Sequence, residues 1–369
     1  MKILTATKNE KLKMQNAKWK RGVARVVVLH FAFLVFHFSL QFASAADEAV
    51  SPQTEAAIDR GLKYLAEKQE KEGTWHTNIG PSSAVTSLGV MAFLARGHSP
   101  GQGPYGETIN RAIDYVVGHQ MPNGLLSAAN GTMYDHGVST VMLCEAFGMV
   151  DESRKAKLEA AIGKAAKVIL DAQKVPQGPH QGGWRYQINS ADADISVTGW
   201  QLMALRGAAN CGAAVPKDSL DKGVAYILRL AVKGEGGFGY QNGGGPNRAR
   251  TGTGILSLEM LGQRSEKQPH LPEALAGGDY LLKNPLTNPG DEFYYYSVYY
   301  GSQAANQLGG KYWEGIYPKI RETLLGRQRP DGSWPEGPSA EQSAGPGYST
   351  AMATLALCVP YHYLPLYQK

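Results

Sequence analysis

Cysteine is scarce in this sequence, and no spacing typical of metal ligands is present. Only three cysteines, Cys144, Cys211 and Cys358, occur in 369 residues, and no two of them form a Cys-x-x-Cys pair. This excludes a cysteine-rich zinc module and a disulfide framework. The histidines between His76 and His270 also lack metal-ligand spacing. The sequence therefore predicts neither a metal site nor a cofactor.

Charged residues are also few, and the net charge is concentrated at one end. They make up 19% of the chain against 43% hydrophobic residues, which is the composition of a globular protein. The formal net charge is +5, but the first 45 residues alone contain eight lysines and arginines against one glutamate. Because the remainder is close to neutral, we expect no clustered basic face and no nucleic-acid partner.

The first 45 residues have the three parts of a secretory signal. A basic stretch is followed by an apolar segment at 26–42 and then by the small-x-small site Ala43-Ser44-Ala45. We predict a signal peptide at 1–45, cleavage after Ala45, and one mature domain at 46–369 that is periplasmic or secreted. The alternative is an uncleaved N-terminal signal anchor, because the apolar run lies near the lower length limit for spanning a bilayer.

A repeated segment of the mature chain predicts a helix followed by a glycine-rich turn. It is clearest at 60–75 (RGLKYLAEKQEKEGTW) and recurs at 111–126 (RAIDYVVGHQMPNGLL), with partial copies from 164, 222, 278 and 319. Apolar residues recur at three- and four-residue spacing, and glycine or proline ends the pattern. These copies are amphipathic helices in our interpretation.

A second, more apolar segment alternates with the first and also occurs six times. Its copies occupy 84–97, 135–148, 194–207, 249–262, 296–309 and 346–359. Alignment places small residues in one column: Gly89, Thr140, Gly199, Gly254, Gly301 and Ala351. Since glycine destabilises a helix interior by roughly 1 kcal/mol relative to alanine, the column predicts that neighbouring helices approach closely there.

Six pairs of one amphipathic and one apolar helix predict two concentric layers. The fold class is therefore an all-α (α/α)6 toroid of six helical hairpins, with the apolar helices in the inner layer and the amphipathic helices in the outer layer. The alternative is an open solenoid, which would need polar capping repeats that the sequence does not contain.

The segment at 60–75 resembles the Gln-Trp repeat of the squalene and oxidosqualene cyclases. These belong to the terpenoid cyclase and protein prenyltransferase superfamily, whose members share an α/α toroid, and the resemblance covers 52–369. It implies that the glutamine and tryptophan of each copy are structural and tie a turn to neighbouring outer helices. The residues concerned are Gln69, Trp75, Gln120, Gln173, Trp184, Gln328 and Trp334.

The segment from Asp192 to Ser196 resembles the Asp-x-Asp-Asp motif of class II terpenoid cyclases. The resemblance implies that Asp194 protonates a carbon-carbon double bond and that Asp192 supports it, although Ile195 stands in place of the third acid. The alternative is that Asp194 caps the apolar helix that follows it. A capping carboxylate is expected to have a lowered pKa, whereas a proton donor needs a raised one.

Aromatic residues on or beside the inner segments are candidates to line an axial ligand cavity. They are Trp200, Tyr294, Tyr295, Tyr296, Tyr299 and Tyr300. Filling of the core is the alternative role for these side chains.

Two functions remain open. The first is a non-catalytic toroid in the cell envelope that binds an isoprenoid, a lipid or a protein partner. The second is a class II terpene cyclase-like isomerase or lyase that uses Asp194. We favour the first, because one acid of the motif is missing and the chain has room for one toroid, whereas class II triterpene cyclases enclose their substrate between two.

Overall fold

The computed structural model describes residues 50–128, 131–263 and 265–368. Residues 52–369 form one compact unit that contains all of the helices described below. The predicted signal peptide and its cleavage site lie outside the described residues. Within the described ranges, no helix has the length and apolar character needed to cross a bilayer.

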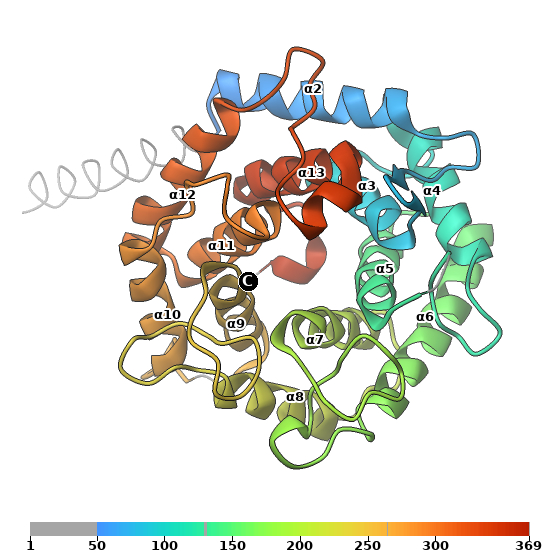
Figure 1. Ribbon diagram of the computed structural model, residues 1–369. Coiled ribbons are helices and arrows are strands. Elements are labelled where there is room, and N and C mark those ends of the chain that lie inside the picture. The colour runs from blue at the N-terminus through green and yellow to red at the C-terminus, as the bar shows by residue number, and fades with distance from the viewer. Residues whose placement is uncertain (1–49, 129–130, 264, 369) are drawn as a thin grey trace, which may run out of the picture. The chain divides into compact units, whose positions relative to one another are not determined.

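Twelve α-helices of the described residues alternate between two layers (Figure 1). The outer helices are α2 (Pro52–Lys68), α4 (Gly106–Gly118), α6 (Glu152–Ala172), α8 (Lys217–Arg229), α10 (Pro272–Lys283) and α12 (Gly310–Leu325). The inner helices are α3 (Ser83–Ala95), α5 (Met133–Ala146), α7 (Ile195–Asn210), α9 (Arg248–Leu261), α11 (Tyr294–Leu308) and α13 (Ala340–Cys358). Each outer helix is followed in the chain by the inner helix of the same hairpin.

The helices form a closed ring. Every residue of the inner helix α3 is buried, whereas the outer helix α2 buries one face. The last inner helix, α13, packs against the first, α3, and the outer helices α12 and α2 also meet. This confirms the all-α toroid of six hairpins and excludes the open solenoid.

Short elements fill the connections between the helices. Strands β1 (His76–Thr77) and β2 (Gly80–Pro81) form a two-stranded antiparallel ribbon after α2. Single turns of 3-10 helix form η1 (Gly103–Tyr105), η2 (Gly178–His180), η3 (Val359–Tyr361) and η4 (Pro365–Tyr367).

The repeat glutamines connect consecutive hairpins. The amide nitrogen of Gln69 donates to the carbonyl of Gly73 in its own turn, at 3.0 Å, and to that of Thr108 in α4, at 2.8 Å. Gln120 and Gln173 make the same pair of bonds, to carbonyls in α6 and α8 respectively. Gln328 donates to Ala57 in α2 at 2.7 Å, which joins the last hairpin to the first. Each side chain therefore ties a turn to the next outer helix.

The repeat tryptophans hold each turn against its own outer helix. The indole nitrogens of Trp75, Trp184 and Trp334 each donate to a backbone carbonyl of the preceding outer helix, at 2.8 Å in all three cases. All three rings are fully buried. A buried indole N–H needs a partner, and the helix carbonyl supplies one.

Two kinds of packing contact explain the small residues in the aligned column of the inner helices. At Gly199, a Cβ atom would lie 2.3 Å from Cγ2 of Thr253 in α9, so the predicted close approach of inner helices is correct there. At Gly89, Gly254 and Gly301 the nearest atoms instead belong to Trp75, Phe238 and Leu286 respectively. Those side chains come from the connection that precedes the same inner helix. For these three glycines the expected helix-helix contact was wrong, because the space is occupied by a turn residue.

The last residues of the chain close one end of the ring. Figure 1 shows the C-terminal end inside the circle of inner helices. The amide of Leu366 donates to the buried carboxyl of Glu145 at 3.2 Å, and Gln307 donates to the carbonyl of Tyr367 at 2.9 Å. Glu145 and Gln307 lie near the C-terminal ends of α5 and α11. The tail therefore covers that end, and the opposite end is formed by the N-termini of the inner helices.

Candidate functional site

A cavity of about 380 Å³ lies at the N-terminal ends of the inner helices. This is within the size range of small-molecule sites. Residues from the N-terminal parts of α5, α7, α9, α11 and α13 form its wall, together with four residues from connections, Tyr186, Tyr240, Glu292 and Phe293. The lining residues are Tyr134, Tyr186, Ser196, Tyr240, Ala249, Arg250, Glu292, Phe293, Tyr296, Ala340, Glu341, Ala344 and Tyr348.

Aromatic rings dominate the wall, which also contains one cation, Arg250, and two carboxyls, Glu292 and Glu341. The guanidinium of Arg250 lies over the ring of Tyr240, 4.6 Å from its centre. The hydroxyls of Tyr240 and Tyr186 are hydrogen-bonded to each other at 2.8 Å. Among the described residues, no carboxylate forms an ion pair with Arg250. The cavity thus combines an apolar aromatic surface with a cation that has no ion-pair partner among the described residues.

Glu341 is a buried carboxyl in the same wall. Its two oxygens accept the backbone N–H groups of Tyr295 and Tyr296 at 3.1 and 2.9 Å. These N–H groups belong to the first turn of α11, whose own preceding residue, Phe293, offers no side-chain cap and has a left-handed φ of 57°. Glu341 therefore caps a helix of the neighbouring hairpin. Burial raises the pKa of this carboxyl to about 7.

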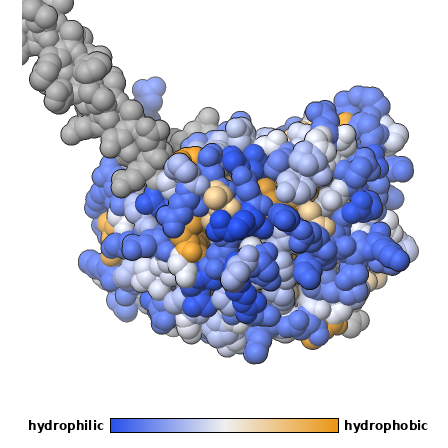
Figure 2. Space-filling view, turned by 90° about the horizontal axis from the view of Figure 1, so that it is seen from above, coloured by the Kyte–Doolittle hydropathy of each residue, from blue (hydrophilic) through white to orange (hydrophobic). Residues whose placement is uncertain are grey.

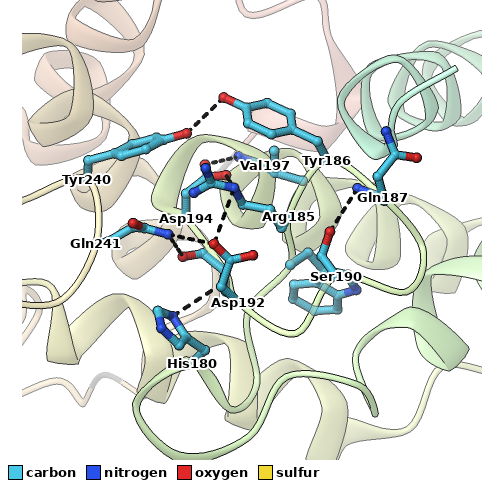
Figure 3. A network of polar contacts seen from close by, with 12 residues as sticks. His180, Arg185, Tyr186, Gln187, Ser190, Asp192, Asp194, Val197, Tyr240 and Gln241 are labelled. Carbon is cyan, nitrogen blue, oxygen red and sulfur yellow. Dashed lines mark hydrogen bonds and ion pairs between the residues drawn. The ribbon is translucent and has the colours of Figure 1, made fainter. Parts of the chain in front are cut away.

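Asp194 caps α7 from inside a buried polar network (Figure 3). Its Oδ1 accepts the backbone N–H groups of Ser196 and Val197 at 2.9 and 3.0 Å. Its Oδ2 lies 3.7 Å from Nε of Arg185 and has no hydrogen-bond partner among the described residues. The side chain is fully buried and is not part of the cavity wall, which Ser196 reaches instead.

Arg185 is shared between the two aspartates. Its Nε lies 3.6 Å from Oδ2 of Asp192, which also accepts a hydrogen bond from Gln241 at 3.2 Å. The guanidinium lies over the rings of Tyr186 and Tyr240, 5.0 and 5.3 Å from their centres. Asp192 and Asp194 therefore both lie beside the guanidinium of Arg185. Tyr186 and Tyr240 lie between this polar network and the cavity.

The pKa of Asp194 does not by itself decide between the capping role and the proton-donor role. Burial raises it to about 6, and the N–H groups of Val197 and Ser196 and the charge of Arg185 oppose the rise. A capping aspartate was expected to have a lowered pKa, and that expectation is wrong here because burial outweighs the hydrogen bonds. Capping is observed, and the catalytic role of Asp194 stays a prediction.

Of the six aromatic residues predicted to line a cavity, Tyr296 alone lines this one. The other five, Trp200, Tyr294, Tyr295, Tyr299 and Tyr300, are buried and absent from its wall. Trp200 stacks on Tyr299 with ring centres 6.3 Å apart and meets Tyr300 edge to face at 5.4 Å. These rings fill the interior below the cavity, which is the alternative role expected for such side chains.

Sequence reasoning missed the charged residues of the wall. Arg250 and Glu341 are far apart in the chain and line one cavity because α9 and α13 both pack against α11. One signal was available: both stand at or shortly before the start of an apolar inner segment, as Asp194 does. Over the described part of the chain, no group of acidic residues, histidines and cysteines has the arrangement of a metal site.

The outer surface offers no comparable apolar site in the face that Figure 2 presents. That face is largely hydrophilic, and its hydrophobic residues form small separate areas. Exposed large hydrophobic side chains of the described residues are scattered in the sequence, as in Ile79, Met121 and Tyr363. A larger hollow of about 900 Å³ lies between α6 and α8, but its lining contains no aromatic residue, so the aromatic cavity at the mouth of the ring is the candidate site for ligand binding.

Comparison with known proteins identifies the fold. No protein-family model and no curated protein matches the sequence. An inactive variant of a Salegentibacter α-1,6-mannanase of family GH76, solved with α-1,6-mannotriose, matches with a TM-score of 0.63 and 10% identity over 84% of this chain and 99% of the mannanase. The GH76 α-mannanase of Bacteroides thetaiotaomicron matches with a TM-score of 0.59 and 12% identity over 86% and 98%.

A terpene cyclase shares the same architecture. The type II terpene cyclase MstE from Scytonema, in complex with its product merosterolic acid A, matches with a TM-score of 0.53 and 16% identity over 85% of this chain and 98% of the cyclase. At such identities the likeness is one of fold. The chain thus shares the (α/α)6 toroid fold with a type II terpene cyclase and with α-mannanases.

Proposed function

We propose that this protein is a toroid that binds a small amphipathic molecule, with an apolar body and an anionic group, in the cavity at the N-terminal mouth of the ring. The observation that carries the proposal is Arg250, which stacks on Tyr240 in an aromatic wall without an ion-pair partner among the described residues. An isoprenoid that carries a phosphate or carboxylate has this combination of properties.

The wall divides into parts suited to the two ends of such a ligand. The rings of Tyr134, Tyr296 and Tyr348 offer apolar faces. The guanidinium of Arg250 offers several N–H donors in a fixed plane, which suits a phosphate or carboxylate. Neither carboxyl of the wall, Glu292 or Glu341, forms an ion pair with this cation, and the oxygens of Glu341 accept N–H groups of the first turn of α11.

Calorimetric titration with geranyl diphosphate and geraniol tests the proposal. These two probes share the hydrocarbon and differ in the anionic group. We expect the diphosphate to bind more tightly, by about tenfold or more, since a hydrogen bond to a charged group is worth about 1.5–3 kcal/mol. The variant Arg250→Met is expected to remove this preference while geraniol still binds. Equal affinity of the two probes for the unchanged protein would contradict the proposal.

Matched variants separate binding in the cavity from binding elsewhere. Arg229→Met removes a cation that also lies over a tyrosine, Tyr226, but on the outer helix α8, and it should leave the preference unchanged. Ala344→Trp places a large side chain at the cavity wall and should abolish binding of both probes. α-1,6-Mannotriose, the ligand of the mannanase of similar fold, is expected to bind weakly because it has neither an apolar chain nor a charge.

Acid chemistry on an isoprenoid is the second candidate function. It is favoured by the raised pKa of Asp194, about 6, by its Oδ2 without a hydrogen bond, and by the fold shared with a type II terpene cyclase. In this alternative Asp194 is the proton donor and Asp192 supports it through Arg185. Incubation with geranylgeranyl diphosphate and analysis for cyclised products tests it. Product that disappears in Asp194→Asn would support catalysis, and absence of product would leave binding as the function.

We further propose that the protein acts in the cell envelope after export and cleavage behind Ala45, where a lipid or a protein partner would be available. The support is the basic, apolar and small-residue order of positions 1–45. N-terminal sequencing of protein purified from its native envelope tests this. A mature start at Ala46 is expected, whereas an intact Met1 or Lys2 start would favour the signal anchor.

A further inference from the structure

Two of the three cysteines lie side by side in the ring. Cys144 is in the last turn of α5, and Cys211 directly follows α7. The thiol of Cys211 donates to the carbonyl of Cys144 at 3.7 Å, although 67 residues separate them in the chain. Both side chains are partly exposed. Neither residue belongs to the cavity or to the polar network of Asp194.

Cys144 packs against a glycine of α7. A Cβ atom at Gly207 would lie 2.9 Å from Cβ and 3.2 Å from Sγ of Cys144, so the thiol rests directly on the backbone of α7. Gly207 and Cys211 are four residues apart and share one helix face. Cys144 and Cys211 therefore both lie along this face of α7, and the Cys211 thiol reaches the backbone of Cys144. The hydrogen bond between the two thiols lowers the pKa of Cys211 and, together with burial, raises the pKa of Cys144, so Cys211 is the thiol that attacks first.

We infer that Cys144 and Cys211 are a redox pair that closes to a single disulfide between α5 and the end of α7. The inference is independent of the ligand in the cavity. Formation of this disulfide needs an oxidant, which is a low-molecular-weight disulfide such as oxidised glutathione. Cys358 is buried in α13 and stays a thiol.

The reaction is a double thiol-disulfide exchange. The thiolate of Cys211 attacks one sulfur of oxidised glutathione, whose S–S bond breaks and releases one glutathione thiolate. The thiolate of Cys144 then attacks the Cys211 sulfur of the mixed disulfide and releases the second glutathione. The protein loses two protons and two electrons, and the oxidant is reduced to two thiols.

Thiol counting on the full, natively folded chain tests the inference. The folded protein is incubated with oxidised glutathione, then unfolded in denaturant that contains N-ethylmaleimide so that the buried thiol also reacts, and analysed by intact mass and peptide mapping. We expect the number of alkylated thiols to fall from three to one, a peptide that links Cys144 to Cys211, and a higher melting temperature because the link restricts the unfolded chain. Three alkylated thiols, or a link that includes Cys358, would overturn the inference.

Serine variants assign the exchange to this pair. Cys358→Ser should still form the link and keep no free thiol. Cys144→Ser should stop at a stable mixed disulfide between Cys211 and glutathione, since no second thiol is in reach. Accumulation of that mixed disulfide in the unchanged protein would show that the thiols cannot close, and would also overturn the inference.

Discussion

At Asp194, burial and backbone hydrogen bonds act on the pKa in opposite directions. The carboxyl caps α7 and is fully removed from solvent. Burial is the larger effect, so the folded pKa is about 6, above the value of about 3.9 expected in an unfolded chain. Between these two values the folded state binds more protons than the unfolded state.

This difference predicts a pH dependence of stability with a definite sign. The free energy of unfolding should fall as pH rises from about 4 to about 6, and the loss, on the order of 3 kcal/mol, should be complete above that range. Asp194→Asn keeps a capping oxygen and cannot ionise, so it should lack this contribution. Urea unfolding of both proteins at several pH values measures it. Parallel pH profiles would contradict the pKa assignment.

Asp151 provides a control of opposite sign. It caps α6 at the surface, and hydrogen bonds from Arg154 and Ser153 lower its pKa. Its contribution to stability is present above the unfolded pKa and is lost as pH falls. Asp151→Asn should therefore weaken the protein at neutral pH and have less effect in acid.

At the scale of helices, the space beside a glycine decides its role. Gly199 in α7 faces Thr253 of α9 at a distance that leaves no room for a methyl group, whereas Gly163 in the outer helix α6 has open space around it. Gly199→Ala should lower the free energy of unfolding by about 1–3 kcal/mol through overpacking. Gly163→Ala should raise it by about 0.4–1 kcal/mol. Denaturant unfolding distinguishes them, and destabilisation of equal size by both would contradict the packing account.

The glutamine that joins the last hairpin to the first predicts a second effect on stability. Gln328 donates to the carbonyls of Ala57 and Gly332. Gln328→Ala removes both bonds and should cost about 2 kcal/mol, at roughly 1 kcal/mol for each bond. Gln342→Ala, at an exposed position of α13, should change stability by less than about 0.5 kcal/mol. Chemical unfolding of the two variants makes the comparison, and similar values for both would argue against a role for Gln328 in closing the ring.

At the scale of the whole molecule, the two ends of the ring differ. The C-terminal tail covers one end through Glu145, Tyr299 and Gln307, while the other end holds the cavity. Removal of residues 364–369 should lower the melting temperature by several degrees, because it exposes the apolar contacts of Leu366 and Tyr367. Tyr363→Ala, at a side chain that is 51% exposed, serves as the control and should have little effect. An unchanged melting temperature after truncation would show that the tail is dispensable.

The ring itself could be predicted from the sequence, because its evidence is repeated six times. Alternation of amphipathic and apolar segments indicated the two layers, and the Gln-Trp repeat indicated the turns. The cavity could not be predicted in this way. Arg250 and Glu341 stand in different repeats, and only the packing of α9 and α13 around α11 places them in one wall. Tyr299 and Tyr300 carry the same sequence signal as Tyr296, yet they point into the packed interior.

The central claim is that the mouth of the ring receives an amphipathic anion. A crystal structure of the protein grown with geranyl diphosphate tests it most directly. We predict density for the ligand in the cavity, with the diphosphate within hydrogen-bonding distance of Arg250 and the hydrocarbon against Tyr296 and Tyr348. An empty cavity at saturating ligand, or a ligand bound only on the outer helices, would contradict the account.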